Sequence, residues 1–176
     1  MKRIMIIGCG GSGKSTLAKQ IYYLTKLELI HLDQVFFKPG WIELEKEEWA
    51  EKNRELLKKE EWIIDGNYGS TMDMRLEKAD TVIFMDTPTH IRLIRVLKRG
   101  IQYFGKTRPD MASGCPEKVS IEFLRYILFY NKTRRPNILK KLKFYEKEKQ
   151  VLILKNKKAI NSFLQGLKSN QTQNTF

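Results

Sequence analysis

A glycine-rich segment near the N-terminus restricts the fold of this chain more than any other feature. Residues 8–15 read G-C-G-G-S-G-K-S, which fits the pattern G-x-x-x-x-G-K-[ST]. An apolar, strand-like run at residues 4–7 directly precedes this segment, and residues 14–23 have the apolar spacing of a helix. A strand before the motif and a helix after it distinguish a phosphate-binding loop (P-loop) from a chance match. The segment therefore predicts a P-loop that binds ATP or a close relative.

The residue types in this segment suit the phosphates of a nucleotide. Glycines let backbone N–H groups turn inward around phosphate oxygens, and the N-terminus of the following helix adds the positive end of its dipole. In such a loop Lys14 reaches the β- and γ-phosphates, and the hydroxyl of Ser15 binds Mg²⁺. The residues expected to contact the nucleotide are Gly8, Gly10, Gly11, Ser12, Gly13, Lys14, Ser15 and Thr16.

The same segment allows one rival interpretation. Gly8, Gly10 and Gly13 also satisfy the dinucleotide-binding pattern G-x-G-x-x-G, and Asp33 lies 20 residues after Gly13, where that fold binds ribose. This interpretation assigns no role to the Lys-Ser pair that ends the motif. We therefore prefer the P-loop and keep the dinucleotide-binding fold as the alternative.

Apolar runs alternate with helical patterns along the chain, which indicates βα units and a parallel sheet. Residues 100–118 contain five Gly or Pro residues and read as a loop with turns. Pro136 is expected to interrupt a helix that starts near residue 119, and Asn156 is expected to cap the last helix. The predicted strands are residues 4–7, 29–32, 62–64, 81–85 and 151–154; the other predicted helices are residues 14–23, 44–60 and 89–99.

Three predicted strands are each followed or closed by an aspartate: Asp33, Asp65 and Asp86. Parallel sheets bind ligands at the carboxyl ends of their strands. Asp65 is our candidate for the Mg²⁺ site beside Ser15, and Asp33 is our candidate for contact with a substrate hydroxyl. Capping of a following turn or helix is the alternative for each of the three, and it is strongest for Asp86.

Positive charge is concentrated in the second half of the chain. Residues 1–88 hold 13 basic and 15 acidic side chains, whereas residues 89–176 hold 20 basic and 5 acidic ones. Such an excess suits a polyanionic ligand, either clustered nucleotide phosphates or a nucleic-acid backbone. The candidate phosphate-binding arginines are Arg95 and Arg99, one helical turn apart, Arg108 in the glycine- and proline-rich loop, and Arg134 beyond it; solvated surface arginines are the alternative.

The gross properties fit one compact cytoplasmic domain. No apolar run approaches the length of a membrane span, the start of the chain lacks the features of a signal peptide, and the two cysteines have neither zinc nor disulfide-framework spacing. We therefore expect no membrane partner.

The residues assembled so far resemble the nucleoside monophosphate kinase group, of which adenylate kinase is a familiar member. Within that group the chain is most similar to small bacterial proteins named FlaR-like or DNA topology modulation proteins. This resemblance implies a three-layer α/β fold: a five-stranded parallel sheet with helices on both faces. It also implies an acceptor-binding insertion at 33–61 and a short arginine lid at 100–118 within a domain of residues 1–168, followed by a polar tail at 169–176. The segments that carry the resemblance are H-L-D at 31–33, K-P-G-W at 38–41, W-I-I-D-G-N-Y at 62–68, R-P-D-M at 108–111 and G-C-P-E at 114–117.

Two hypotheses for function follow. The first is an ATP-dependent kinase that moves the γ-phosphoryl group to a nucleoside, nucleotide or other small hydroxyl compound, with a mobile lid whose Arg99 and Arg108 lack partners until phosphates arrive. The second is a nucleotide-switched DNA-binding regulator, suggested by residues 132–149 with their eight basic and two acidic side chains. For the kinase, the expected catalytic residues are Lys14, Asp33, Arg95, Arg99, Arg108 and Arg134, with ATP and Mg²⁺, the latter at Ser15 and Asp65.

Overall fold

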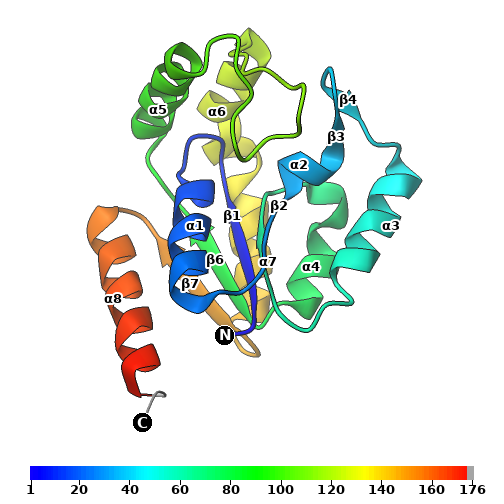
Figure 1. Ribbon diagram of the computed structural model, residues 1–176. Coiled ribbons are helices and arrows are strands. Elements are labelled where there is room, and N and C mark those ends of the chain that lie inside the picture. The colour runs from blue at the N-terminus through cyan, green and yellow to red at the C-terminus, as the bar shows by residue number, and fades with distance from the viewer. Residues whose placement is uncertain (174–176) are drawn as a thin grey trace.

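A five-stranded parallel β-sheet forms the centre of the computed structural model, which describes residues 1–173 (Figure 1). Its strands lie in the order β2-β5-β1-β6-β7, and every neighbouring pair is parallel. All five carboxyl ends therefore lie at one edge, as the predicted fold requires. The strands are β1 (Arg3–Gly8), β2 (Leu29–His31), β5 (Trp62–Asp65), β6 (Thr81–Met85) and β7 (Gln150–Leu154).

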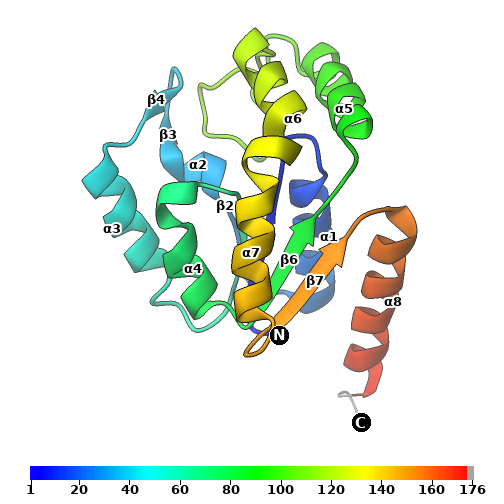
Figure 2. The same cartoon turned by 180° about the vertical axis from the view of Figure 1, so that it is seen from behind.

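Helices cover both faces of this sheet, so the central strand β1 is buried on both sides. Ile4 and Ile6 belong to one apolar cluster, while Met5 and Ile7 belong to the cluster on the opposite face. Two helices, α1 (Lys14–Thr25) and α8 (Lys157–Gln173), pack on the first face. The second face is covered by α3 (Lys46–Leu56), α4 (Met72–Lys78), α5 (Thr89–Gln102), α6 (Ile121–Thr133) and α7 (Arg135–Tyr145), of which α6 and α7 are seen best in Figure 2.

Most helix boundaries follow the predicted ones, with informative exceptions. The break at Pro136 is confirmed, because α6 ends at Thr133 and α7 begins with this proline in its first turn. The cap is also confirmed: the Asn156 carboxamide oxygen accepts a hydrogen bond of 2.9 Å from the backbone N–H of Ala159. Helix α5 runs three residues into the predicted loop, and α8 continues to Gln173, well into the predicted polar tail.

The insertion after β2 contains short elements that the sequence did not predict. Helix α2 (Leu32–Phe36) leads into an antiparallel hairpin of β3 (Phe37–Lys38) and β4 (Ile42–Glu43). A 3₁₀ turn, η1 (Gly69–Thr71), follows β5. No helix within residues 1–173 is long and apolar enough to cross a membrane.

The segment between α5 and α6, residues 103–120, has no regular element beyond isolated bridges and packs against the β3–β4 hairpin (Figure 1). Backbone N–H of Gly40 donates to the carbonyl of Gly114 at 2.9 Å, and Trp41 Nε1 donates to the carbonyl of Pro116 at 3.0 Å. The two segments also share a small apolar cluster. Its members are Met111, Ala112, Cys115, Phe37 and Trp41.

Candidate active site

The P-loop connects β1 to α1 with the backbone shape that the motif predicts. Gly11 has φ +73, and a Cβ on it would lie 2.5 Å from the Arg92 carbonyl oxygen, so only glycine fits. Gly13, at φ +98, is the N-cap of α1 and supplies no side-chain cap. The first N–H groups of α1 are therefore available to an anion. Lys14 Nζ donates to the Cys9 carbonyl at 3.2 Å and is held beside the loop.

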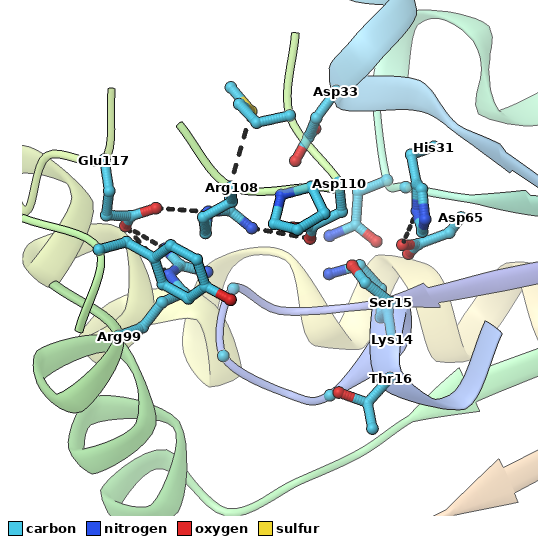
Figure 3. A pocket seen from close by; sticks show the side chains of 18 of the residues that line it. Lys14, Ser15, Thr16, His31, Asp33, Asp65, Arg99, Arg108, Asp110 and Glu117 are labelled. Carbon is cyan, nitrogen blue, oxygen red and sulfur yellow. Dashed lines mark hydrogen bonds and ion pairs between the residues drawn. The ribbon is translucent and has the colours of Figure 1, made fainter. Parts of the chain in front are cut away.

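The P-loop opens into a cavity of about 970 Å³ at the carboxyl edge of the sheet (Figure 3). One end is lined by the P-loop and α1, and the other by α2, the β3–β4 hairpin, the turn after β5 and the 103–120 segment. This volume lies at the upper end of the range of small-molecule sites, which is about 300–1,000 Å³. Of the residues predicted to act in catalysis or metal binding, it brings together Lys14, Ser15, Asp33, Asp65, Arg95, Arg99 and Arg108.

Asp65 and His31 form a buried pair in the lining of the cavity. They are register partners at the ends of β5 and β2, and His31 Nδ1 lies 3.0 Å from Asp65 Oδ2. The second carboxylate oxygen of Asp65 is buried without a hydrogen-bond partner in the described chain. A buried, unsatisfied carboxylate oxygen beside a P-loop serine fits a cation, since Mg²⁺ in kinase sites is held by one or two carboxylates together with substrate phosphates.

Asp33 projects into the same cavity from α2. The Tyr68 hydroxyl donates to Asp33 Oδ1 at 2.6 Å. Burial raises the pKa of Asp33 above its usual value, and the Tyr68 hydrogen bond and Lys14 oppose that rise. Tyr68 itself has φ +38, and this turn is held by Arg75, which donates to the carbonyls of Asn67 and Tyr68 at 2.5 and 2.9 Å.

Arg99 and Arg108 converge on one buried carboxylate, that of Glu117 (Figure 3). Arg99 Nη2 lies 2.9 Å from Glu117 Oε1, and Arg108 Nε pairs with Glu117 Oε2. Arg108 Nη1 also lies 2.7 Å from Asp110 Oδ2. Burial raises the pKa of Asp110, but Arg108 and a hydrogen bond with Ser15 outweigh this effect and hold it below the usual value. The expectation that both arginines lack partners before phosphates arrive is therefore wrong.

Other predicted site residues lie elsewhere. Arg134 is exposed at the junction of α6 and α7 and does not line the cavity. Arg95 lines it while donating from Nη1 to the Ser12 carbonyl at 3.0 Å. Asp86 forms a two-bond ion pair with Arg135, 2.8 Å for each hydrogen bond, so its role in the described structure is an ion pair between β6 and α7. Gly8 and Ser12 belong to the loop but do not line the cavity.

Sequence reasoning assigned no site role to several residues that line the cavity. His31, Asn67, Asp110 and Glu117 all do so. Asn67 Oδ1 accepts from the backbone N–H of Gly8 at 2.9 Å, which ties the turn after β5 to the P-loop. His31 could have been found by aligning the ends of the two predicted strands, whereas the Asp110 and Glu117 pairings depend on tertiary structure.

Comparisons with known proteins place this architecture among known folds. No protein-family model matches the chain. The uncharacterized protein YqaC of Bacillus subtilis (strain 168) is 30% identical over 136 residues, which cover 74% of this chain and 73% of that protein.

Solved structures of kinases share the fold at low sequence identity. Shikimate kinase from Acinetobacter baumannii in complex with shikimate superposes with a TM-score of 0.57 at 18% identity, over 100% of this chain and 96% of that one. A gluconokinase from Sinorhizobium meliloti 1021 gives 0.54 at 16% identity, over 99% and 98%. Deoxyadenosine kinase from M. mycoides gives 0.50 at 15% identity, over 94% and 98%. The chain therefore has the α/β fold of the P-loop kinases.

Proposed function

We propose a function for this chain, which belongs to the same family as YqaC of Bacillus subtilis: it is a P-loop kinase that transfers the γ-phosphoryl group of ATP to a hydroxyl group of a small acceptor. The observation that carries the proposal is the shared cavity, in which the Asp33 carboxylate and Lys14 both face the space beside the P-loop. A protein that only binds nucleotide does not need a carboxylate such as Asp33 in a second part of the cavity, facing the position of the phosphates. The kinase fold of the solved structures supports the same proposal.

The role of each residue follows from its position in the cavity. The P-loop N–H groups and Lys14 hold the donor phosphates, and Asp33 accepts a hydrogen bond from the acceptor hydroxyl and receives its proton. The pKa of Asp33 is raised, so it lies closer to neutral pH than the pKa of an ordinary aspartate, and a pKa nearer the working pH suits a general base. Ser15 and Asp65 would hold Mg²⁺, which when bound neutralises charge on the β- and γ-phosphates. Arg95, which is hydrogen-bonded to the P-loop, lies where it can contact the donor phosphates, whereas Arg99 is paired with Glu117.

The proposal is tested by release of ADP from ATP–Mg²⁺ in the presence of nucleosides, nucleotides, shikimate, gluconate and other small hydroxyl compounds. We expect turnover with at least one acceptor well above the rate with water alone. In Lys14→Ala we expect that turnover to fall about a hundredfold or more with the fold intact, because a preorganised charge on the phosphates is lost. Lys141→Ala is the matched control, since Lys141 pairs with Asp73 on the outer surface. Unchanged nucleotide affinity and turnover in Lys14→Ala would contradict the assignment.

We also propose that the family is the FlaR-like, or DNA topology modulation, group, on the segments quoted above.

DNA binding as the main function finds less support. Within residues 132–149, Arg135 pairs with Asp86, Lys141 pairs with Asp73, and Lys149 donates to three backbone carbonyls. These cations already have partners in the chain. Duplex binding that falls steeply with rising salt would favour the nucleic-acid hypothesis.

A further inference from the structure

The two ends of the cavity carry different charge. At the P-loop end the cavity is lined by Lys14, Lys19 and Arg95, with Asp110 hydrogen-bonded to Ser15 and Asp65 at the position proposed for Mg²⁺. The remaining charged residues of the described lining are three cations and three carboxylates. These are Arg99, Arg108 and Lys118 against Asp33, Glu43 and Glu117. The acceptor end therefore has no surplus of positive charge.

The two arginines at this end are already engaged. The Glu117 side chain is only 2% exposed and accepts from both Arg99 and Arg108, while Asp110 binds Arg108 from the other side. An anionic acceptor that bound these guanidinium groups would have to displace Glu117. That carboxylate would then remain buried without its partners, which is strongly unfavourable.

Lys118 is the remaining cation, and it lies at the rim. Its side chain is exposed, and its ammonium group sits 4.8 Å from the centre of the Trp41 ring. A single exposed ammonium contributes little to binding an anion, because water and salt screen it. The uncharged part of the lining at this end is aromatic, formed by the half-buried rings of Phe37, Trp41 and Tyr68.

We propose, on the basis of the kinase function proposed above, that the acceptor carries no phosphate or carboxylate group: it is an uncharged or amino-substituted hydroxyl compound with a ring that packs on the wall of Phe37, Trp41 and Tyr68. The hydroxyl group lies at Asp33, and the ring replaces water on the aromatic surface. Carboxylates at this end favour a neutral or cationic ligand over an anionic one by simple complementarity. Nucleoside monophosphates and sugar acids are thereby excluded as preferred acceptors.

The first experiment compares matched pairs of acceptors that differ in one anionic group. Each common nucleoside is paired with its 5′-monophosphate, and hydroxymethyl-substituted aromatic rings are paired with their carboxylated forms. We expect kcat/KM with ATP–Mg²⁺ to be at least about tenfold higher for the member without the anion, the factor of one charge-assisted hydrogen bond. A preference for the anionic members overturns this inference and leaves the kinase function standing. Turnover with none of the compounds contradicts the kinase function.

The second experiment tests the charge of the acceptor end without any turnover. The protein is saturated with a non-hydrolysable ATP analogue and Mg²⁺, and binding of inorganic sulfate is measured by calorimetry. We expect wild-type protein to bind sulfate weakly and Glu117→Gln to bind it about tenfold more tightly, since Arg99 and the Nε group of Arg108 then lose their carboxylate partner and can hold an anion. Asp73→Asn is the matched control, because it frees a lysine far from the cavity and should leave sulfate binding unchanged.

The two experiments separate the inference from the kinase function. Sulfate binding by the wild type as tight as by Glu117→Gln overturns the inference whatever the acceptor screen shows. Should Glu117→Gln unfold, Asp110→Asn removes one of the two carboxylates that pair with Arg108, and we expect a smaller gain in sulfate affinity in the same direction. Tighter sulfate binding in either variant, absent from the control, supports the inference even if every acceptor fails.

Discussion

Removal of the Tyr68 hydroxyl isolates the group that we place at the acceptor. In Tyr68→Phe the ring is kept, so its packing on Phe36 and Trp49, with ring centroids 4.7 and 4.9 Å away, is preserved. Only the 2.6 Å hydrogen bond to Asp33 Oδ1 is lost. The variant therefore changes the protonation equilibrium of Asp33 without enlarging the cavity wall.

The size of the effect follows from that one hydrogen bond. A hydrogen bond to a charged carboxylate contributes about 1.5–3 kcal/mol, which corresponds to a rise of about 1–2 units in the pKa of Asp33. Burial has already raised this pKa above 3.8, so the rise adds to an elevated value. Because the carboxylate is the active form, activity falls as pH falls through this pKa, and the variant should lose activity at a higher pH than the wild type.

The sign of the stability effect is the reverse of that for an ordinary salt-bridged aspartate. A raised pKa means that the folded protein binds the proton more tightly than the unfolded chain, so stability falls as pH rises from 3.8 through the folded pKa. In Tyr68→Phe that fall extends to higher pH. We expect the loss of unfolding free energy to be about 1.5–3 kcal/mol at neutral pH and smaller below pH 3.8, where the lost hydrogen bond was to a neutral carboxyl group.

The assay is a ¹³C NMR titration of the Asp33 carboxyl carbon, which requires no knowledge of the acceptor. The acid limb of kcat/KM gives a second measurement once an acceptor is found. Tyr126→Phe is the matched control: Tyr126 lines the same cavity, but its hydroxyl accepts a hydrogen bond of 3.4 Å from Asn67 instead of bonding to Asp33. An unchanged or lowered pKa of Asp33 in Tyr68→Phe would refute the reasoning.

Three further predictions concern other parts of the site. Asp86→Asn should lower the free energy of unfolding by about 1–3 kcal/mol at neutral pH. Because Arg135 lowers the pKa of the Asp86 carboxyl, the difference in unfolding free energy between wild type and variant should disappear as pH falls through the folded pKa, which urea unfolding at several pH values measures. Gly11→Ala should lower the free energy of unfolding by about 2–5 kcal/mol, because the residue has a left-handed backbone and its Cβ would clash with α5. Gly105→Ala, with φ +67 and open space around it, should lower that free energy by only about 1–2 kcal/mol. Equal shifts in melting temperature would contradict the close approach at Gly11. Arg134→Ala should leave nucleotide affinity unchanged, whereas Arg95→Ala should weaken it about tenfold in equilibrium titrations, because Arg95 both lines the cavity and holds the P-loop.

Much of the fold was predictable because its sheet is parallel and buried. Strands covered on both faces are continuous apolar runs, as at residues 62–64, and such runs stand out between charged helices. The end of α5 was missed because Gly100 suggested a break. In the structure a Cβ on Gly100 would lie 2.5 Å from Val119 Cγ2, so the glycine allows close packing against the following segment and the helix continues past it. Tertiary packing here overrides local propensity.

The site was predictable only where local sequence determines it. The P-loop needs one strand, one turn and one helix in succession, and all three are visible in the sequence. Arg134 was expected in the site as one of the arginines of the basic second half, but the helix break before Pro136 leaves it exposed. The hairpin of β3 and β4 has strands of two residues each, too short to produce a periodic pattern. Glu117 was missed because an isolated glutamate in a loop carries no sign of the two arginines that it joins.

The contact between the 103–120 segment and the β3–β4 hairpin has a kinetic consequence. Both segments border the cavity, and a backbone hydrogen bond, a hydrogen bond from the Trp41 side chain and a common apolar cluster tie them to each other. Two separately hinged flaps would let each ligand exchange on its own. Here either the 103–120 segment and the β3–β4 hairpin move away from the cavity together, or the contacts between them must break first. Entry of both ligands and departure of both products would then share one gate, and the opening rate of that gate would set an upper limit on turnover.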